Sequence, residues 1–166
     1  MSEHPLLQAD LILRALLDAK VRFVLIGGLA SQVHGSPSLT GDVDVCFALD
    51  GENLGRLAAA LDTLAAIRRE LSPGTAAPID ARALRAGDVF TLTTRYGELD
   101  LLAHPGPGLD FATLAEHSIA AEVLGVEVRV ASLADLIAMK RAAGRPKDRI
   151  ELEILGALRE ELDRRD

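Results

Sequence analysis

The chain has 166 residues, of which 49% are hydrophobic and 26% are charged, so we expect one folded domain and exclude a largely disordered chain. Its net charge of −7 argues against a surface that coats nucleic acid through clustered lysine and arginine, although a local basic patch stays open. The lone Cys46 excludes an intrachain disulfide, no apolar run could span a bilayer, and the amino terminus lacks the layout of a signal peptide. We therefore expect a cytoplasmic protein without membrane contact.

The first elements in chain order are a helix, a strand and a second helix. Apolar residues at helical spacing predict an amphipathic helix over residues 5–17. Residues 22–26 form a β-rich run that ends at Gly27-Gly28, and residues 29–34 are suited to a helix. The pattern is a strand, a glycine turn and a helix.

The middle of the chain alternates between sheet and helix signals. Proline and small polar residues predict a loop over 35–41 and a connection over 72–78. The other expected elements are a strand at 42–47, a helix at 53–67 and a β-hairpin formed by 89–94 and 98–103 around Tyr96-Gly97.

The last part of the chain is predicted to be mostly helical. A short strand is expected at 125–130, followed by a helix at 133–143 with Ser132 as its N-cap. Pro146 suits the first turn of a final helix that runs toward residue 162. The fold class is therefore mixed α/β (α+β) in one domain, 1–166, with a core at about 20–130 and a helical part at about 131–166.

Asp42 and Asp44 are the strongest candidates for chemistry. Residues two apart on a strand point to the same face, and the alternation with Val43 and Val45 supports a strand here. Both carboxylates then project from one side and offer the hard oxygen ligands that Mg²⁺ prefers. One ion could orient a triphosphate, and a second could activate an attacking hydroxyl, which requires a third carboxylate.

Asp100 is the candidate for that third acid, because an acidic residue between two leucines is hard to explain by core packing. Glu98 shares its face by the same alternation and is the substitute. Asp100 could bind metal or accept the proton of the incoming hydroxyl.

Gly27 and Gly28 would let backbone amides approach a phosphate, and Ser31 could donate a further hydrogen bond. Alone, a glycine pair more often only turns the chain, and an isolated Asp-x-Asp is usually solvated. The order of a glycine turn, Asp42-Val43-Asp44 and a later acidic strand favours a functional site.

These motifs resemble the nucleotidyltransferase superfamily that includes DNA polymerase beta. The similarity is nearest to minimal bacterial nucleotidyltransferases and to nucleotidyltransferase toxins of the AbiEii kind. The stretches that carry it are 25–30, 34–35, 40–44, 132–140 and 145–148. The resemblance implies a mixed β-sheet flanked by helices, with C-terminal helices.

The resemblance also implies roles for single residues. Asp42, Asp44 and Asp100 would be the catalytic metal ligands, for two Mg²⁺ ions when nucleotide is bound, and Gly27, Gly28 and Ser31 would form the phosphate turn. Lys140 would face the nucleotide, and Asp148 would orient that lysine. One departure is Ser38, which stands at about the place where relatives often carry a basic residue.

Three functions follow as expectations. The first is a metal-dependent nucleotidyltransferase that moves a nucleoside monophosphate from an NTP to a hydroxyl of RNA, tRNA or protein, as a component of a toxin–antitoxin system with an antitoxin partner. The second is a small-molecule nucleotidyltransferase of the antibiotic-modifying kind. The third is a catalytically degenerate nucleotide-binding or partner protein. The sequence does not choose the nucleotide, the acceptor or the oligomeric state.

Overall fold

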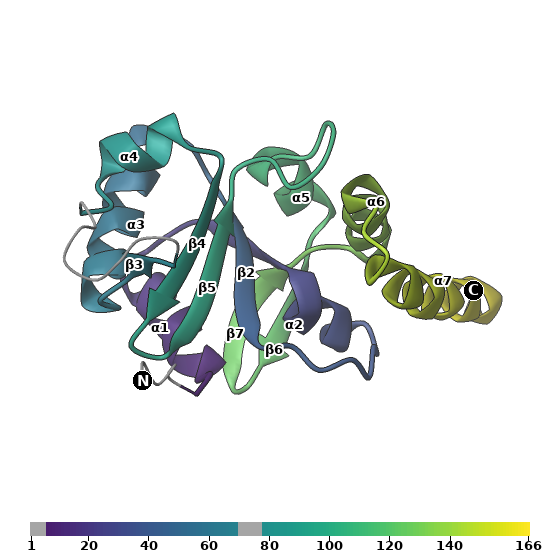
Figure 1. The fold of residues 1–166 in the computed structure, drawn as a ribbon. Helices are drawn as coiled ribbons and strands as arrows, with labels where there is room; N and C mark the ends of the chain where they lie inside the picture. The colour runs from purple at the N-terminus through teal and green to yellow at the C-terminus, as the bar shows by residue number, and fades with distance from the viewer. Residues whose placement is uncertain (1–5, 70–77) are drawn as a thin grey trace.

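The computed structural model describes residues 6–69 and 78–166, and it arranges them as helices around one mixed β-sheet (Figure 1). The strands are β1 (Phe23–Ile26), β2 (Asp42–Phe47), β3 (Ile67–Arg68), β4 (Val89–Thr94), β5 (Gly97–Leu102), β6 (Ile119–Val123) and β7 (Val126–Val130). The helices are α1 (Ala9–Asp18), α2 (Gly27–Val33), α3 (Gly51–Thr63), α4 (Ala81–Ala86), α5 (Phe111–His117), α6 (Leu133–Ala143) and α7 (Asp148–Arg165).

The sheet has the strand order β3-β4-β5-β2-β1-β7-β6. Two neighbouring pairs, β2 with β5 and β1 with β7, run parallel, and the other pairs run antiparallel. Strand β2, which carries Asp42, therefore lies between β1 and β5. This order brings the glycine turn after β1 and Asp100 on β5 next to Asp42 and Asp44 in the middle of the sheet. The expected mixed α/β architecture is confirmed.

Helices lie on both sides of this sheet. α1, α3 and α4 lie on one side, and α5, α6 and α7 lie on the other, with α7 extending away from the sheet (Figure 1). In β2 the side chains of Val43, Val45 and Phe47 are fully buried, whereas Asp42 and Asp44, on the other face, are only partly buried; Cys46, which follows them on that face, is buried as well. The alternation thus sends the apolar residues into the core and the carboxylates to the opposite face.

Several helices differ in their bounds from the prediction, among them α2, which begins at Gly27 rather than at residue 29 and ends at Val33 rather than at residue 34. α1 begins at Ala9 rather than at residue 5. α3 begins at Gly51, because the Asp50 carboxylate accepts a hydrogen bond from the backbone N–H of Asn53 and caps the helix. It ends at Thr63, since Ala65 has a left-handed backbone with φ of 52°, and Ile67 belongs to β3 instead.

Pro146 does not lie within the first turn of the last helix, because α7 begins at Asp148.

Four elements were not predicted: β3, α4, α5 and the edge strand β6. α4 and α5 are short, and each begins after an aspartate N-cap, Asp80 or Asp110. Most of the connection expected at 72–78 lies outside the described residues. In the described part of the chain, no helix is long and apolar enough to cross a membrane.

Candidate active site

Three carboxylates meet on the polar face of the central strands. Asp44 on β2 and Asp100 on β5 are directly opposite partners in the parallel register, and Asp42 is paired with Glu98. One oxygen from each of Asp42, Asp44 and Asp100 lies within 4.8 Å of the other two. The structure therefore brings together the three acids that the sequence singled out, and it leaves Glu98 outside this group.

Burial and neighbouring carboxylates raise the pKa of two of these acids, Asp44 and Asp100. Burial, together with the charges of Asp42 and Asp100, raises the pKa of Asp44 from 3.8 to about 8. Burial and Asp42 also raise the pKa of Asp100, although the Arg69 guanidinium opposes this shift. Three oxygen donors that repel one another so strongly fit a divalent cation, which would hold all of them in the ionised form.

Gly27 allows the chain to turn against the acidic group. A Cβ atom at Gly27 would lie 2.0 Å from Oδ2 of Asp44, and its φ of 73° is a left-handed conformation. A Cβ atom at Gly28 would lie 2.6 Å from the Cβ of Thr40, whose hydroxyl donates to Oδ1 of Asp42 at 3.1 Å. Both glycines are thus required by close contacts around the acids, beyond the turn itself.

Ser31 is placed less favourably for its expected role. It lies in α2 with only 1% of its surface exposed, and its hydroxyl has no hydrogen-bond partner. In this conformation the hydroxyl is closed off from solvent, which argues against direct contact with a phosphate.

Lys140 and Asp148 are joined to each other across α6 and α7. Lys140 Nζ donates to Oδ1 of Asp148 at 3.1 Å, and Arg145 Nε donates to Oδ2 at 2.8 Å. The Asp148 side chain is only 2% exposed. Burial alone would raise the pKa of Asp148, but the hydrogen bonds from Arg145 and Lys140 hold it below its usual value. Asp148 is therefore hydrogen-bonded to Lys140. That it orients the lysine toward a nucleotide, and that Lys140 contacts a nucleotide, stay predictions.

Ser38 takes part in a link between the loop at 35–41 and α7. The hydroxyls of Ser36 and Ser38 donate to the two carboxylate oxygens of Glu151 at 3.1 and 2.7 Å. The position at which relatives often carry a basic residue is thus used here to attach the loop beside the glycine turn to the last helix.

Arg69 is a residue near the acids that the sequence did not indicate. It follows β3, and its Nη2 donates to Oδ1 of Asp100 at 3.0 Å while its Nε lies 3.5 Å from Oε1 of Glu98. Residues 53–67 had been predicted as one helix, so no sequence signal placed Arg69 next to the sheet.

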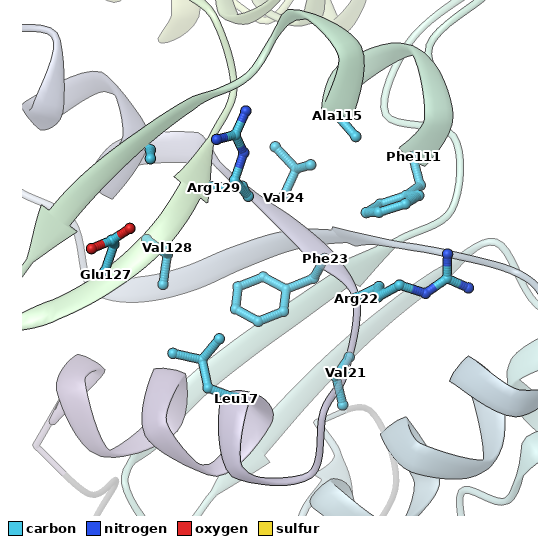
Figure 2. A pocket seen from close by; sticks show the side chains of 11 residues that line it. Leu17, Val21, Arg22, Phe23, Val24, Phe111, Ala115, Glu127, Val128 and Arg129 are labelled. Carbon is cyan, nitrogen blue, oxygen red and sulfur yellow. The ribbon is translucent and has the colours of Figure 1, made fainter.

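A pocket of about 300 Å³ lies at the other end of β1 (Figure 2). Phe23 and Val24 line it from β1, Phe111 and Ala115 from α5, and Val128 from β7. Phe23 pairs with Phe47, whereas Ile26 pairs with Asp44, so the length of β1 separates this pocket from the acids. The pocket is not part of the acidic site.

Comparisons with known proteins agree on the fold. No protein-family profile and no curated protein matches the sequence. Among solved structures, the lincosamide antibiotic adenylyltransferase LnuA with bound lincomycin has a TM-score of 0.59 and 15% identity, over 93% of this chain and 99% of its own. A Thermotoga maritima protein assigned as a nucleotidyltransferase has a TM-score of 0.53 and 17% identity, over 97% and 98%.

A third similar structure is ANT(2'')-Ia in complex with adenylyl-2''-tobramycin, with a TM-score of 0.52 and 22% identity over 93% of this chain and 94% of its own. All three similarities extend over nearly the whole of both chains. At these identities they establish the fold, and this chain has the nucleotidyltransferase fold that the sequence motifs implied.

Proposed function

We propose that this protein is a metal-dependent nucleotidyltransferase that moves a nucleoside monophosphate from a nucleoside triphosphate to a hydroxyl group. The observation that carries this proposal is the convergence of Asp42, Asp44 and Asp100 within 4.8 Å, beside Gly27, on a nucleotidyltransferase fold. A structural role alone does not explain three mutually repelling carboxylates at the centre of a sheet.

The three aspartates would hold Mg²⁺, and two ions would fit the reaction when nucleotide is bound. Bound magnesium supplies charge neutralisation of the triphosphate and acidifies the attacking hydroxyl. Gly27 and Gly28 would offer their backbone amides to the phosphates, while the space left by their missing Cβ atoms is taken by Asp44 and Thr40. Lys140, held by Asp148, offers the positive charge expected near the triphosphate, and Ser31 has at most a supporting role in the turn.

In the proposed reaction the acceptor oxygen attacks the α-phosphorus of the triphosphate. A new P–O bond forms, the bond between the α-phosphorus and the oxygen that bridges to the β-phosphate breaks, and pyrophosphate leaves. The hydroxyl proton is taken by a carboxylate, for which Asp100 is our candidate because it belongs to the acidic group and lies opposite Asp44 on the neighbouring strand.

Two classes of acceptor are proposed. The sequence resemblance favours a hydroxyl on RNA, tRNA or protein, as in a toxin that is controlled by an antitoxin. The similar structures favour a small molecule, since LnuA is bound to lincomycin and ANT(2'')-Ia to adenylyl-2''-tobramycin, and this chain matches 94–99% of their length. Transfer of labelled nucleotide to tRNA, to protein, or to lincosamide and aminoglycoside probes separates the two classes.

The first test of the proposal is calorimetric titration of ATP, GTP, CTP and UTP into the protein, with and without Mg²⁺, alongside Asp42→Ala. Binding that requires both the metal and Asp42 is the expected result, and it identifies the donor nucleotide. No binding under any condition would overturn the catalytic proposal in favour of a degenerate partner protein.

A further inference from the structure

Arg69 belongs to a row of side chains that crosses the sheet to the acidic group. Its backbone N–H donates to the carbonyl of Thr91, Thr91 pairs with Asp100, and Asp100 pairs with Asp44. Directly paired residues share a face of the sheet, so Arg69, Asp100 and Asp44 project on the same side. The row leads from the β3 edge of the sheet to the centre of the proposed metal site.

The guanidinium of Arg69 is attached to the sheet at several points. Nη2 donates to Oδ1 of Asp100 and also to the backbone carbonyl of Leu92, both at 3.0 Å, while Nε lies 3.5 Å from Glu98. The side chain is 28% exposed. An exposed ion pair between two mobile side chains contributes little, but this guanidinium also donates to the main-chain carbonyl of Leu92, and the backbone N–H of Arg69 donates to Thr91.

We propose that Arg69 is a positioning residue for the acidic site: it holds the carboxylate of Asp100 against Asp42 and Asp44, and it thereby strengthens cation binding and speeds nucleotidyl transfer. The inference rests on the proposed function. A carboxylate has about four lone-pair positions, so the hydrogen bond from Arg69 leaves acceptor capacity on Asp100 for a metal ion. Residues that orient metal ligands in this way typically change affinity or activity 10–100-fold.

Positioning and simple charge compensation predict opposite results. If Arg69 acted only as a nearby positive charge, its removal would make the site more negative and would increase affinity for a cation. If Arg69 positions Asp100, its removal decreases that affinity, because the carboxylate is no longer held toward Asp42 and Asp44. The sign of the change therefore tests the inference.

The experiment compares Mn²⁺ binding to wild type, Arg69→Gln and Arg69→Lys by calorimetry and by electron paramagnetic resonance, together with kcat and KM for the nucleotide. Arg68→Gln is the matched control, since it removes the same charge one residue away, where Arg68 instead lies 5.1 Å from the ring centre of Phe90. We expect Arg69→Gln to weaken Mn²⁺ binding and lower kcat by about 10–100-fold with little change in KM. Arg69→Lys should recover part of both, and Arg68→Gln should match wild type.

Unchanged or tighter Mn²⁺ binding by folded Arg69→Gln, when wild type binds the ion, overturns this inference and leaves the proposed function intact. If Arg69→Gln does not fold, Arg69→Lys decides, and wild-type affinity in that variant overturns the inference. Wild-type protein that binds no Mn²⁺ overturns the proposed function, and the inference with it. Mn²⁺ binding without nucleotidyl transfer overturns the proposed function and, with it, the effect of Arg69 on transfer, whereas the effect of Arg69→Gln on Mn²⁺ affinity still tests whether Arg69 positions Asp100.

Discussion

Burial and two neighbouring carboxylates all raise the pKa of Asp44. Together they raise its pKa to about 8, so at neutral pH the metal-free site holds a proton that a bound cation must displace. The ionised Asp44 therefore lowers the free energy of unfolding when no cation is bound. A bound cation would offset this repulsion.

The first prediction concerns Asp44→Asn. The variant should be more stable than wild type at pH 8 without metal, since it removes the repulsion, and it should lose more than about 100-fold in transfer, beyond the range seen for residues that only support a ligand. Thermal unfolding and a transfer assay measure the two effects. Asp62→Asn, at an exposed position on α3, is the control and should change neither. Full transfer activity in Asp44→Asn would remove Asp44 from the site.

The second prediction concerns Gly27→Ala. The added Cβ atom would lie 2.0 Å from Asp44 Oδ2, on a backbone with φ of 73°, so the carboxylate or the turn must move. We expect a loss of about 1–2 kcal/mol in the free energy of unfolding, measured with urea, and loss of Mg²⁺-dependent nucleotide binding. A Cβ atom at Gly41 has no neighbour within 4 Å, so Gly41→Ala is the matched control. Equal effects of the two substitutions would contradict the role given to Gly27.

Among the elements, α7 depends on polar contacts for its position. Leu155 is fully buried, but Ile150 is largely exposed and Leu162 about half exposed, so only part of the apolar surface of α7 packs on the rest of the chain. The buried Asp148 at its first residue receives hydrogen bonds from Lys140 of α6 and from Arg145, and Glu151 receives those of Ser36 and Ser38. These contacts connect the last helix to α6 and to the loop beside the acids.

The third prediction concerns Asp148→Asn. The pKa of Asp148 is lowered in the fold, so its contribution to stability is full above the unfolded value near 3.8 and is lost as the pH falls through the folded value. Urea unfolding at pH 7 should show a loss of about 1.5–3 kcal/mol, the range for hydrogen bonds to charged groups. The difference from wild type should stay constant above about pH 4 and shrink as the pH falls below 3.8. Asp163→Asn, exposed on α7, is the control, and a loss that is independent of pH would argue against an ionic origin.

At the scale of the whole molecule, the acidic group links stability to pH and to metal. The folded state binds the Asp44 proton more tightly than the unfolded state, because the pKa rises from 3.8 to about 8 on folding. The unfolded state therefore holds fewer protons between these values, and the free energy of unfolding falls as the pH rises from about 4 to about 8.

The fourth prediction is that metal-free protein loses at most about 5 kcal/mol through Asp44 over this pH range, and that Mg²⁺ restores more stability at pH 8 than at pH 5. Thermal unfolding from pH 5 to pH 9, with and without Mg²⁺, measures both effects. Asp44→Asn should flatten the dependence on pH and abolish the response to Mg²⁺. The same response in the variant would show that the effect arises elsewhere in the molecule.

Local patterns in the sequence determined the face on which the candidate acids lie. The alternation in 42–47 has a period of two, and a strand with that period must place Asp42 and Asp44 opposite the buried valines. The N-cap Ser132 likewise marked the start of α6, and the expected bounds 133–143 are those of the helix. The extent of the domain and the nucleotide-binding roles stay predictions.

The tertiary structure decided what lies next to the acids. Pairing of Asp44 with Asp100 depends on the register between strands that are far apart in the chain, and local periodicity carries no information on that register. Arg69 reaches Asp100 only because a two-residue strand, too short to show an alternation, adds to the edge of the sheet. The sequence by itself therefore determined which residue types could form the site, whereas strand pairing decided their distances, their pKa shifts and their cationic neighbour.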